Sequence, residues 1–173
     1  MNDLNTGGTM LEYALKYAEK GWPVFPCKFD KTPYAQNGVL NATTNKDTIR
    51  QFWGRWPNAN IGVHLGQAHM MALDLDPGHD LPAIEKITGS LQTGLSQTTP
   101  RGGRHLIFSL AENEVVPPSA SKIAKHIDVR SKNSYILVPP STTVDGAYSW
   151  DCEEAPCFRP QKLLELCVGK KQK

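Results

Sequence analysis

The chain has 173 residues, of which 39% are hydrophobic and 21% charged, and its formal net charge is +2 at pH 7. This length favours a single domain with a sizeable buried core, and no apolar run approaches the roughly 20 residues of a membrane-spanning helix. The net charge is too small to imply nucleic-acid binding by itself, so any such contact depends on the local placement of basic side chains.

The N-terminus and the cysteines favour a cytoplasmic protein. Residues 1–9 are polar and lack a signal-peptide pattern. The four cysteines, which have no zinc-type CxxC spacing, are Cys27, Cys152, Cys157 and Cys167. Cys152 and Cys157 could lie close together, but unpaired thiols are the favoured interpretation.

The first predicted element is a helix. Thr9 and Glu12 have the spacing of a capping box, and an apolar stripe follows them. This pattern predicts a helix over about residues 10–20, ended by Gly21. A short strand over residues 22–27 is expected next.

A loop and a second helix follow. Turn signals predict a loop over residues 28–43, and Thr44 and Asp47 mark the start of a helix. Its hydrophobic face, which is ended by Pro57, consists of Ile49, Phe52, Trp53 and Trp56. Core packing is the favoured interpretation of this aromatic face, and a base-stacking platform is the alternative.

Strands dominate the rest of the chain. Two strands, over residues 61–65 and 70–76, flank a predicted hairpin turn at residues 66–69. Further strands are expected at residues 104–110, 126–130, 135–138 and 147–150, and helices at residues 80–86 and 161–168. Because two helices come first and strands cluster later, without strict βαβ alternation, we expect an α+β fold with a mixed or antiparallel central sheet flanked by helices.

Two aspartates end one of these strands. Side chains alternate across a strand, so Asp74 and Asp76 face the same way, about 6 to 7 Å apart, opposite the apolar residues between them. From there both could bind one divalent cation or bridge two. The alternative is that they only precede a turn at residues 77–78.

A glycine-containing loop opens another strand. Gly102 and Gly103 would let backbone N–H groups approach an anion, and Arg104 and His105 follow them directly. At this position His105 could donate to a phosphate. The alternative is a structural, hydrogen-bonded histidine behind an ordinary turn.

A third strand repeats the alternation. Asp128 and Arg130 face one way, while Ile127 and Val129 face the core. Such an acid and base are more often a surface ion pair. Here, however, three apolar strands carry acids that suit divalent cations and bases that suit phosphates, which favours a metal-dependent phosphoryl-transfer site.

Short blocks from about residue 11 to residue 150 form a longer pattern. They are GWPVFP at 21–26, KTP at 31–33, NIGV at 60–63, LDLDP at 73–77, TP at 99–100 with GGRHLIF at 102–108, IDVR at 127–130, YILVPPS at 135–141 and GAYSW at 146–150. Their order and spacing resemble the bifunctional DNA primase/polymerase N-terminal domain of phage and plasmid replication proteins, in the archaeo-eukaryotic primase superfamily. The resemblance implies a primase-like catalytic core with an RRM-like sheet.

The resemblance also implies roles for individual residues. Asp74, Asp76 and Asp128 would bind two catalytic Mg²⁺ or Mn²⁺ ions, and His105, the fourth catalytic residue, would contact the phosphates of the incoming nucleotide. The other candidates for binding the nucleotide or its phosphates are Lys31, Gly102, Gly103, Arg104 and Arg130. The superfamily often has a serine where this chain has Gly103, so a backbone N–H would serve instead. Some relatives carry a zinc-binding insertion, but this chain has no ligand cluster for one, so no structural zinc is expected.

The implied activity is template-directed nucleotidyl transfer in phage or plasmid DNA replication, with a 3′-hydroxyl attacking the α-phosphate of a nucleoside triphosphate. Expected partners are single-stranded DNA template, primer, nucleoside triphosphates and a helical or helicase region of the full-length protein, in a bacterial or archaeal cytoplasm and without a membrane.

Residues 1–160 would form the catalytic domain, and residues 161–173 a helix and basic tail that could start a linker. The alternatives are a non-catalytic primase-like module that binds single-stranded DNA, and a metal-dependent nuclease or phosphohydrolase.

Overall fold

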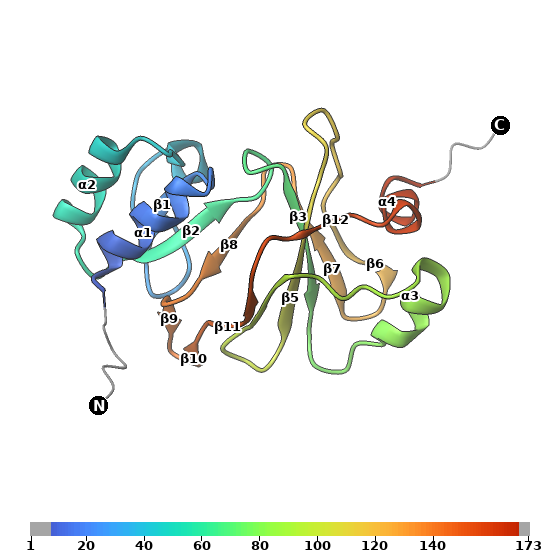
Figure 1. Ribbon diagram of the computed structural model, residues 1–173. Coiled ribbons are helices and arrows are strands. Elements are labelled where there is room, and N and C mark those ends of the chain that lie inside the picture. Colours follow the sequence, from blue (N-terminus) through green and yellow to red (C-terminus); the bar gives the residue numbers. More distant parts are fainter. Residues whose placement is uncertain (1–7, 170–173) are drawn as a thin grey trace.

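The computed structural model describes residues 8–169 and has the predicted α+β fold (Figure 1). Its helices are α1 (Met10–Glu19), α2 (Lys46–Arg55), α3 (Leu81–Thr88) and α4 (Gln161–Val168), with a 3₁₀ turn η1 (Gly38–Asn41). Its strands are β1 (Val24–Cys27), β2 (Asn60–His64), β3 (Met70–Leu75), β4 (Leu95–Thr98), β5 (Arg104–Ser109), β6 (Ser119–Ala124), β7 (Ile127–Arg130), β8 (Tyr135–Val138), β9 (Thr142–Thr143), β10 (Gly146–Ala147), β11 (Ser149–Glu153) and β12 (Cys157–Phe158).

The strands form two main sheets. The small sheet has the order β1-β2-β8 and is antiparallel. The large sheet has the order β11-β4-β5-β3-β7-β6, with β12 added in parallel to β5. Strands β9 and β10 form a separate short ribbon. Figure 1 shows α1 and α2 with the small sheet in one half of the molecule, and α3 and α4 with the large sheet in the other.

The predicted hairpin at residues 66–69 is wrong. Strand β2 pairs with β1 and β8, whereas β3 pairs with β5 and β7, so this turn carries the chain from the small sheet to the large one. Residue 66 lies so close to the Lys132 carbonyl group that a Cβ at this position would overlap it. The chain can make this crossing because Gly66 has no Cβ. Local turn residues predicted the turn correctly, but strand pairing was decided by partners far along the chain.

Helices α1 and α2 each begin at a side chain that caps the first turn. Thr9 caps α1 by accepting a hydrogen bond from the Glu12 N–H at 3.2 Å, as predicted. Helix α2 is capped by Asn45, whose side chain accepts from the Thr48 N–H at 2.9 Å, one residue after the predicted start at Thr44.

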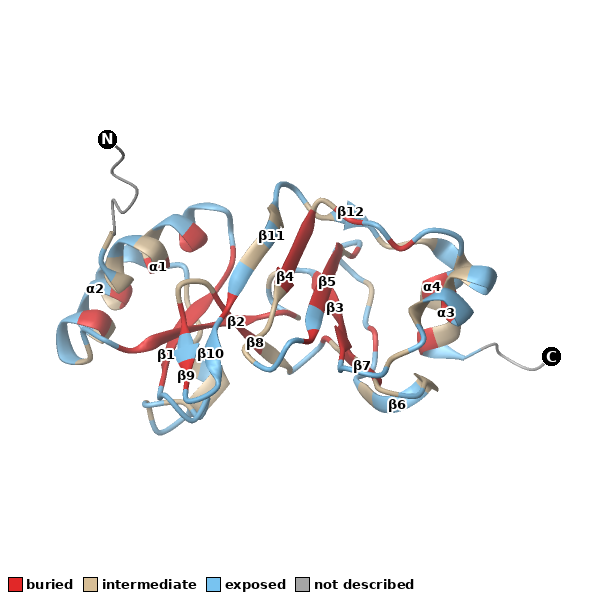
Figure 2. Ribbon diagram, turned by 90° about the horizontal axis from the view of Figure 1, so that it is seen from below, coloured by how far each residue is buried: buried red, intermediate tan, exposed pale blue. Residues whose placement is uncertain are grey.

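Two hydrophobic cores cover the two faces of the large sheet. Figure 2 shows that its central strands, β3, β4 and β5, consist mostly of buried residues. On one face, Met71, Leu73 and Leu75 of β3 pack with residues of α3 and α4. On the other, Met70 and Ala72 join a core shared with α1, α2 and the small sheet. The predicted alternation of β3 is therefore confirmed. Asp74 follows Met70 and Ala72 on the same face of the strand, at the edge of the core shared with the small sheet.

Several strands were not predicted. They include β4, with the mixed sequence LSQT, β6, with the sequence SASKIA, and β12, which has only two residues. All four cysteines are free, as expected. Within residues 8–169, no helix has the length and apolar character required to cross a membrane.

Candidate active site between the two sheets

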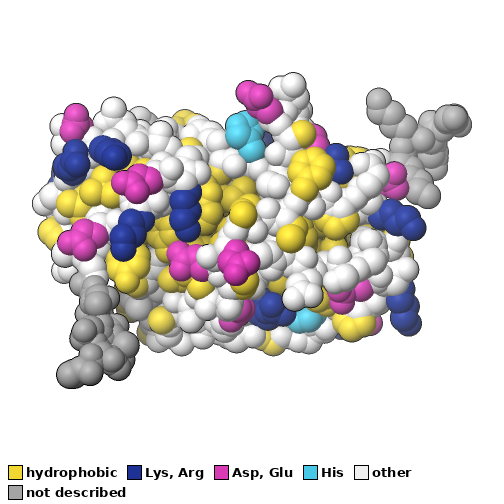
Figure 3. All heavy atoms as spheres, viewed as in Figure 1, with side chains coloured by type: hydrophobic (Ala, Val, Ile, Leu, Met, Phe, Trp, Pro, Cys, Tyr) yellow, Lys and Arg dark blue, Asp and Glu magenta, His cyan; other side chains and the backbone are white. Residues whose placement is uncertain are grey.

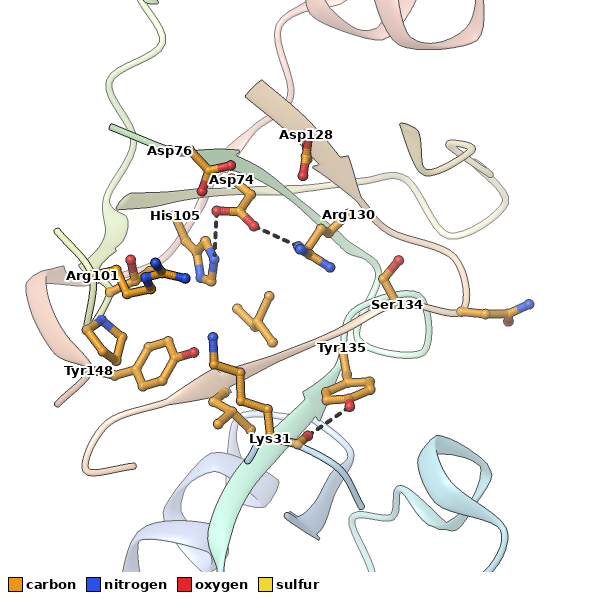
Figure 4. A pocket seen from close by; sticks show the side chains of 15 residues that line it. Lys31, Asp74, Asp76, Arg101, His105, Asp128, Arg130, Ser134, Tyr135 and Tyr148 are labelled. Atoms are coloured by element: carbon orange, nitrogen blue, oxygen red, sulfur yellow. Dashed lines mark hydrogen bonds and ion pairs between the residues drawn. The ribbon is translucent and has the colours of Figure 1, made fainter. Parts of the chain in front are cut away.

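An open pocket of about 430 Å³ lies where the two sheets meet (Figure 4). The large sheet contributes side chains from β3, β5 and β7, and the small sheet contributes side chains from β8. The lining residues are Lys31, Asp74, Asp76, Thr99, Pro100, Arg101, His105, Asp128, Arg130, Asn133, Ser134, Tyr135, Ile136, Leu137 and Tyr148.

The register of three neighbouring strands brings an acid, a base and a second acid side by side. Asp74 of β3 lies directly opposite His105 of β5 and directly opposite Asp128 of β7. Because opposed residues of antiparallel strands share a sheet face, all three side chains face the pocket. Strands β3, β5 and β7 are thus neighbours in the large sheet, with β3 between the other two.

Asp74 is the most tightly held of the acids. Its carboxylate accepts from Arg130 Nε at 2.8 Å and lies 3.3 Å from His105 Nε2, and its side chain is only 12% exposed. Burial alone would raise the pKa of Asp74, but the hydrogen bonds from His105 and Arg130, together with the positive charge of Arg130, outweigh this and lower the pKa to about 2. Asp74 is therefore ionised throughout the physiological range.

The other two acids line the same pocket and differ in their exposure. Asp76 follows β3 and is exposed, while Asp128 is half-buried and accepts from the Ser121 N–H at 3.0 Å. Among residues 8–169, no group of three histidine, cysteine, aspartate or glutamate side chains is gathered closely enough to hold a metal ion. The three carboxylates thus line one wall of the pocket, where Asp74 is paired with Arg130 and His105, and Asp128 accepts from the Ser121 N–H.

His105 is oriented by a residue that the sequence analysis missed. The Gln97 side chain on β4 is fully buried, and its Nε2 lies 2.8 Å from His105 Nδ1 and 2.9 Å from the carbonyl oxygen of Leu137. The reverse orientation of the amide would put Oε1 against that carbonyl oxygen, so the nitrogen faces both groups. Nδ1 of His105 therefore accepts, and Nε2 carries the hydrogen that points to Asp74.

Gln97 has a further property that marks it as unusual. Its Oε1 is buried without a hydrogen-bond partner, and it is the one such side-chain atom among the described residues. A lone glutamine within LSQT gave no signal, because this short segment was not expected to be a strand. Only the pairing of β4 with β5, which places Gln97 opposite His105, reveals the contact.

Two tyrosines and a lysine complete the wall formed by the small sheet and its loops (Figure 4). Tyr135 donates from its hydroxyl to the carbonyl oxygen of Lys31 at 2.8 Å, which holds the loop carrying Lys31 against the pocket. The Tyr148 ring lies 6.4 Å from the His105 ring, and burial raises the pKa of Tyr148 to about 12. Tyr148 is therefore a hydroxyl donor at neutral pH.

Three predicted phosphate-binding residues are not brought to the pocket. The Arg104 side chain lies on the strand face opposite to that of His105, and its Nε lies 3.5 Å from Asp151 Oδ2. Gly102 has a φ of +84° and uses its N–H in a turn to the Thr99 carbonyl oxygen. A Cβ on Gly103 would lie 2.6 Å from the Leu75 carbonyl oxygen, so this glycine serves the close approach of two strands. The same loop lines the pocket instead through Thr99, Pro100 and Arg101.

A family model described as bifunctional DNA primase/polymerase, N-terminal, matches residues 14–162. The matched stretch contains every residue that lines the pocket. No curated protein matches the chain.

Proposed function

Because the chain belongs to the bifunctional DNA primase/polymerase N-terminal family, we propose that it is a template-directed nucleotidyltransferase that joins nucleotides to a 3′-hydroxyl in phage or plasmid DNA replication. The observation that carries this proposal is the register of Asp74 with His105 and Asp128, which aligns acids and a base along one open wall. A pocket between two sheets gives room for both a nucleotide and the end of a strand.

The donor set of this wall fits divalent cations. Members of this family are generally metal-dependent, and carboxylate oxygens are the ligands that Mg²⁺ and Mn²⁺ prefer. We propose that Asp74, Asp76 and Asp128 hold two such ions, with Asp74 exchanging Arg130 for the metal. Ions bound there would lower the pKa of the attacking hydroxyl and neutralise charge on the leaving pyrophosphate.

The basic residues have a place in this proposal. Arg130 and His105 compensate the nearly buried charge of Asp74 in the free protein, where an unpaired carboxylate would be costly. Once Asp74 binds a metal ion instead, the N–H groups of Arg130 and His105 can donate to the triphosphate. Lys31 lines the same pocket, and we propose that its ammonium group also contacts the triphosphate. In such a reaction positioning and electrostatics supply most of the rate.

The proposed partners are single-stranded DNA template, primer, nucleoside triphosphates and a helical or helicase region of the full-length protein, in the cytoplasm. Figure 3 shows positive and negative side chains interspersed over one face, so DNA binding would depend on local groups rather than on a single broad field. Contacts with phosphates would make this binding weaken with salt.

A primer-extension assay with Mg²⁺ and with Mn²⁺ tests the proposal. The double variant Asp74→Asn, Asp76→Asn should lose at least about 100-fold in rate, the usual effect of removing a preorganised electrostatic group. His105→Ala should raise the KM for nucleotide. Asp47→Asn is the matched control, because Asp47 lies on α2, outside the pocket, and its side chain is 88% exposed. A folded double variant that extends primers like the wild type would overturn the metal assignment.

The products separate the remaining alternatives. A lengthened strand with released pyrophosphate supports nucleotidyl transfer, whereas a shortened strand without pyrophosphate would identify a nuclease. A folded wild-type protein that binds single-stranded DNA and incorporates no nucleotide with either metal would be a binding module.

A further inference from the structure

The aromatic face of α2 divides between the core and the surface. Ile49 and Trp53 are buried in the core shared with α1, which confirms core packing for these two residues. Trp56, at the end of the helix, is only partly buried and stacks on Tyr34 from the loop after β1. The ring centroids are 4.9 Å apart with an interplanar angle of 19°, and Tyr34 remains 36% exposed.

Two cations flank this pair of rings. The Arg55 guanidinium lies 4.7 Å from the Trp56 ring centroid, and Lys28 Nζ lies 5.8 Å from the Tyr34 ring centroid. The lysine distance is near the outer limit of about 6 Å for a cation–π contact. Tyr34 is therefore a partly exposed ring in a stacked pair, and each ring of the pair has one cation over it.

A second hollow, of about 470 Å³, lies beside these rings. Its chemistry is aromatic, amide and cationic, and no acidic residue lines it. The lining includes Tyr34, Gln36, Gln51, Phe52, Arg55 and Trp56. Exposed rings, amide groups and a guanidinium group without a competing carboxylate suit a ligand that combines planar bases with negative charge.

One loop connects this hollow to the candidate active site. Lys31 lines the active-site pocket, and Tyr34, three residues later, lines the second hollow. Three residues span at most about 11 Å, which equals about three nucleotides at the duplex rise of about 3.4 Å per base. Tyr135 fixes the first end of this segment through the Lys31 carbonyl oxygen, and the Tyr34 N–H fixes the other by donating to the Pro26 carbonyl oxygen at 3.1 Å.

We propose that the Tyr34–Trp56 pair, with Arg55 and Lys28, binds a short stretch of single-stranded nucleic acid, namely the template strand as it leaves the active-site pocket. Stacking on tyrosine accepts every base, which suits a strand whose sequence varies. The two cations contact its phosphates. This inference rests on the proposed function, since it assumes that a template occupies the neighbouring pocket.

Binding of a fluorescent oligothymidylate to the full chain, measured by anisotropy without nucleotide or metal, tests the inference. Tyr34→Ala should weaken binding at least about fivefold, since stacking contributes about 1–3 kcal/mol per base. Tyr34→Phe keeps the ring and should bind like the wild type. Arg55→Gln should reduce the slope of log K against log salt by about 0.7, the value for one single-strand phosphate contact.

The chain offers a matched control at its other end. Phe158 is 54% exposed and also carries an arginine over its ring, with Arg159 4.4 Å from the ring centroid, but it lies in neither hollow. Phe158→Ala should therefore leave binding unchanged. A folded Tyr34→Ala variant with wild-type affinity, or an equal loss in Phe158→Ala, would overturn the inference. Both results are measured as DNA binding. Failure of the proposed function would instead appear in the primer-extension assay, as a wild-type protein that incorporates no nucleotide.

Discussion

At the scale of single residues, the site is organised around one charge that is nearly withdrawn from water. The Asp74 side chain is only 12% exposed, yet it stays ionised because Arg130 and His105 approach both of its oxygens. Burying a carboxylate without partners would be costly, so the two bases are required for the fold as well as being available for substrate. Stability and chemistry are therefore coupled at this residue.

The pH dependence of stability should report this coupling. The pKa of Asp74 in the folded protein, about 2, lies below its ordinary value of 3.8, so its stabilising effect is complete above pH 3.8 and is lost as the pH falls toward 2. The lost stabilisation is about 2 kcal/mol. Urea unfolding of the wild type and Asp74→Asn at several pH values should show their difference in unfolding free energy shrinking by this amount. If the difference in unfolding free energy stayed the same at every pH, the charge of Asp74 would not be stabilised by Arg130 and His105.

A second prediction at this scale concerns Gln97. Gln97→Leu removes the donor to His105 Nδ1, so the imidazole should no longer be restricted to the tautomer with hydrogen on Nε2. We expect a KM for nucleotide raised about tenfold, the effect of about 1.4 kcal/mol from one lost orienting hydrogen bond, and a smaller change in kcat. ¹⁵N NMR of the imidazole would detect the change of tautomer directly.

Ser96→Ala is the control for Gln97→Leu. Ser96 is also buried on β4, but it precedes Gln97 by one position and faces the other side of the sheet. It should leave both KM and the imidazole spectrum unchanged. An unchanged spectrum in folded Gln97→Leu would remove Gln97 from the orientation of His105.

At the scale of elements, sequence patterns predicted the strands that carry the acids. Alternation in β3, β5 and β7 is strong because one side of each strand is buried in the core with α3 and α4. Strand β4 was missed because three of its four residues are polar and two of these, Ser96 and Gln97, are buried, so the strand shows no alternation. Lys31 and Arg130 were candidates from the sequence, whereas Gln97 and Tyr148 reach the site through long-range pairing that no local pattern encodes.

The glycines before β5 give an element-scale prediction. A Cβ on Gly103 would lie 2.6 Å from the Leu75 carbonyl oxygen and 3.0 Å from Thr99 Oγ1, so Gly103→Ala should push β5 away from β3. We expect a loss of about 1–3 kcal/mol in the free energy of unfolding, measured with urea, as for other overpacked sites.

Gly54→Ala provides the opposite control. Gly54 lies in the exposed part of α2 with no atom within 4 Å of an added Cβ, so alanine should stabilise the helix by up to about 1 kcal/mol. Wild-type stability of Gly103→Ala together with a raised KM for nucleotide would restore Gly103 as a phosphate contact.

At the scale of the whole molecule, the two sheets are joined rather than separate. One core contains residues of α1, α2, the small sheet and the large sheet. Polar contacts cross the same junction: Trp150 Nε1 donates to the Tyr17 hydroxyl at 3.1 Å, and Gln97 donates to Leu137. No sequence pattern indicated this division into two sheets, because the turn at residues 66–69 looks like a hairpin turn. The candidate site depends on the junction, since each sheet supplies only part of its wall.

The C-terminal helix supplies the last prediction, which concerns the extent of the folding unit. Residues 161–173 were expected to lie outside the catalytic domain, but Leu163 and Cys167 of α4 are buried in the core with α3 and β3. We therefore propose that the unit includes α4. Leu163→Ala should lower the free energy of unfolding by about 2–5 kcal/mol, whereas Val168→Ala, at a position 49% exposed, should change it by less than about 0.5 kcal/mol. A chain ending at residue 160 uncovers the whole α4 contact, so it should be less stable than Leu163→Ala. If urea unfolding instead found that shortened chain as stable as the full one, the unit would end before α4.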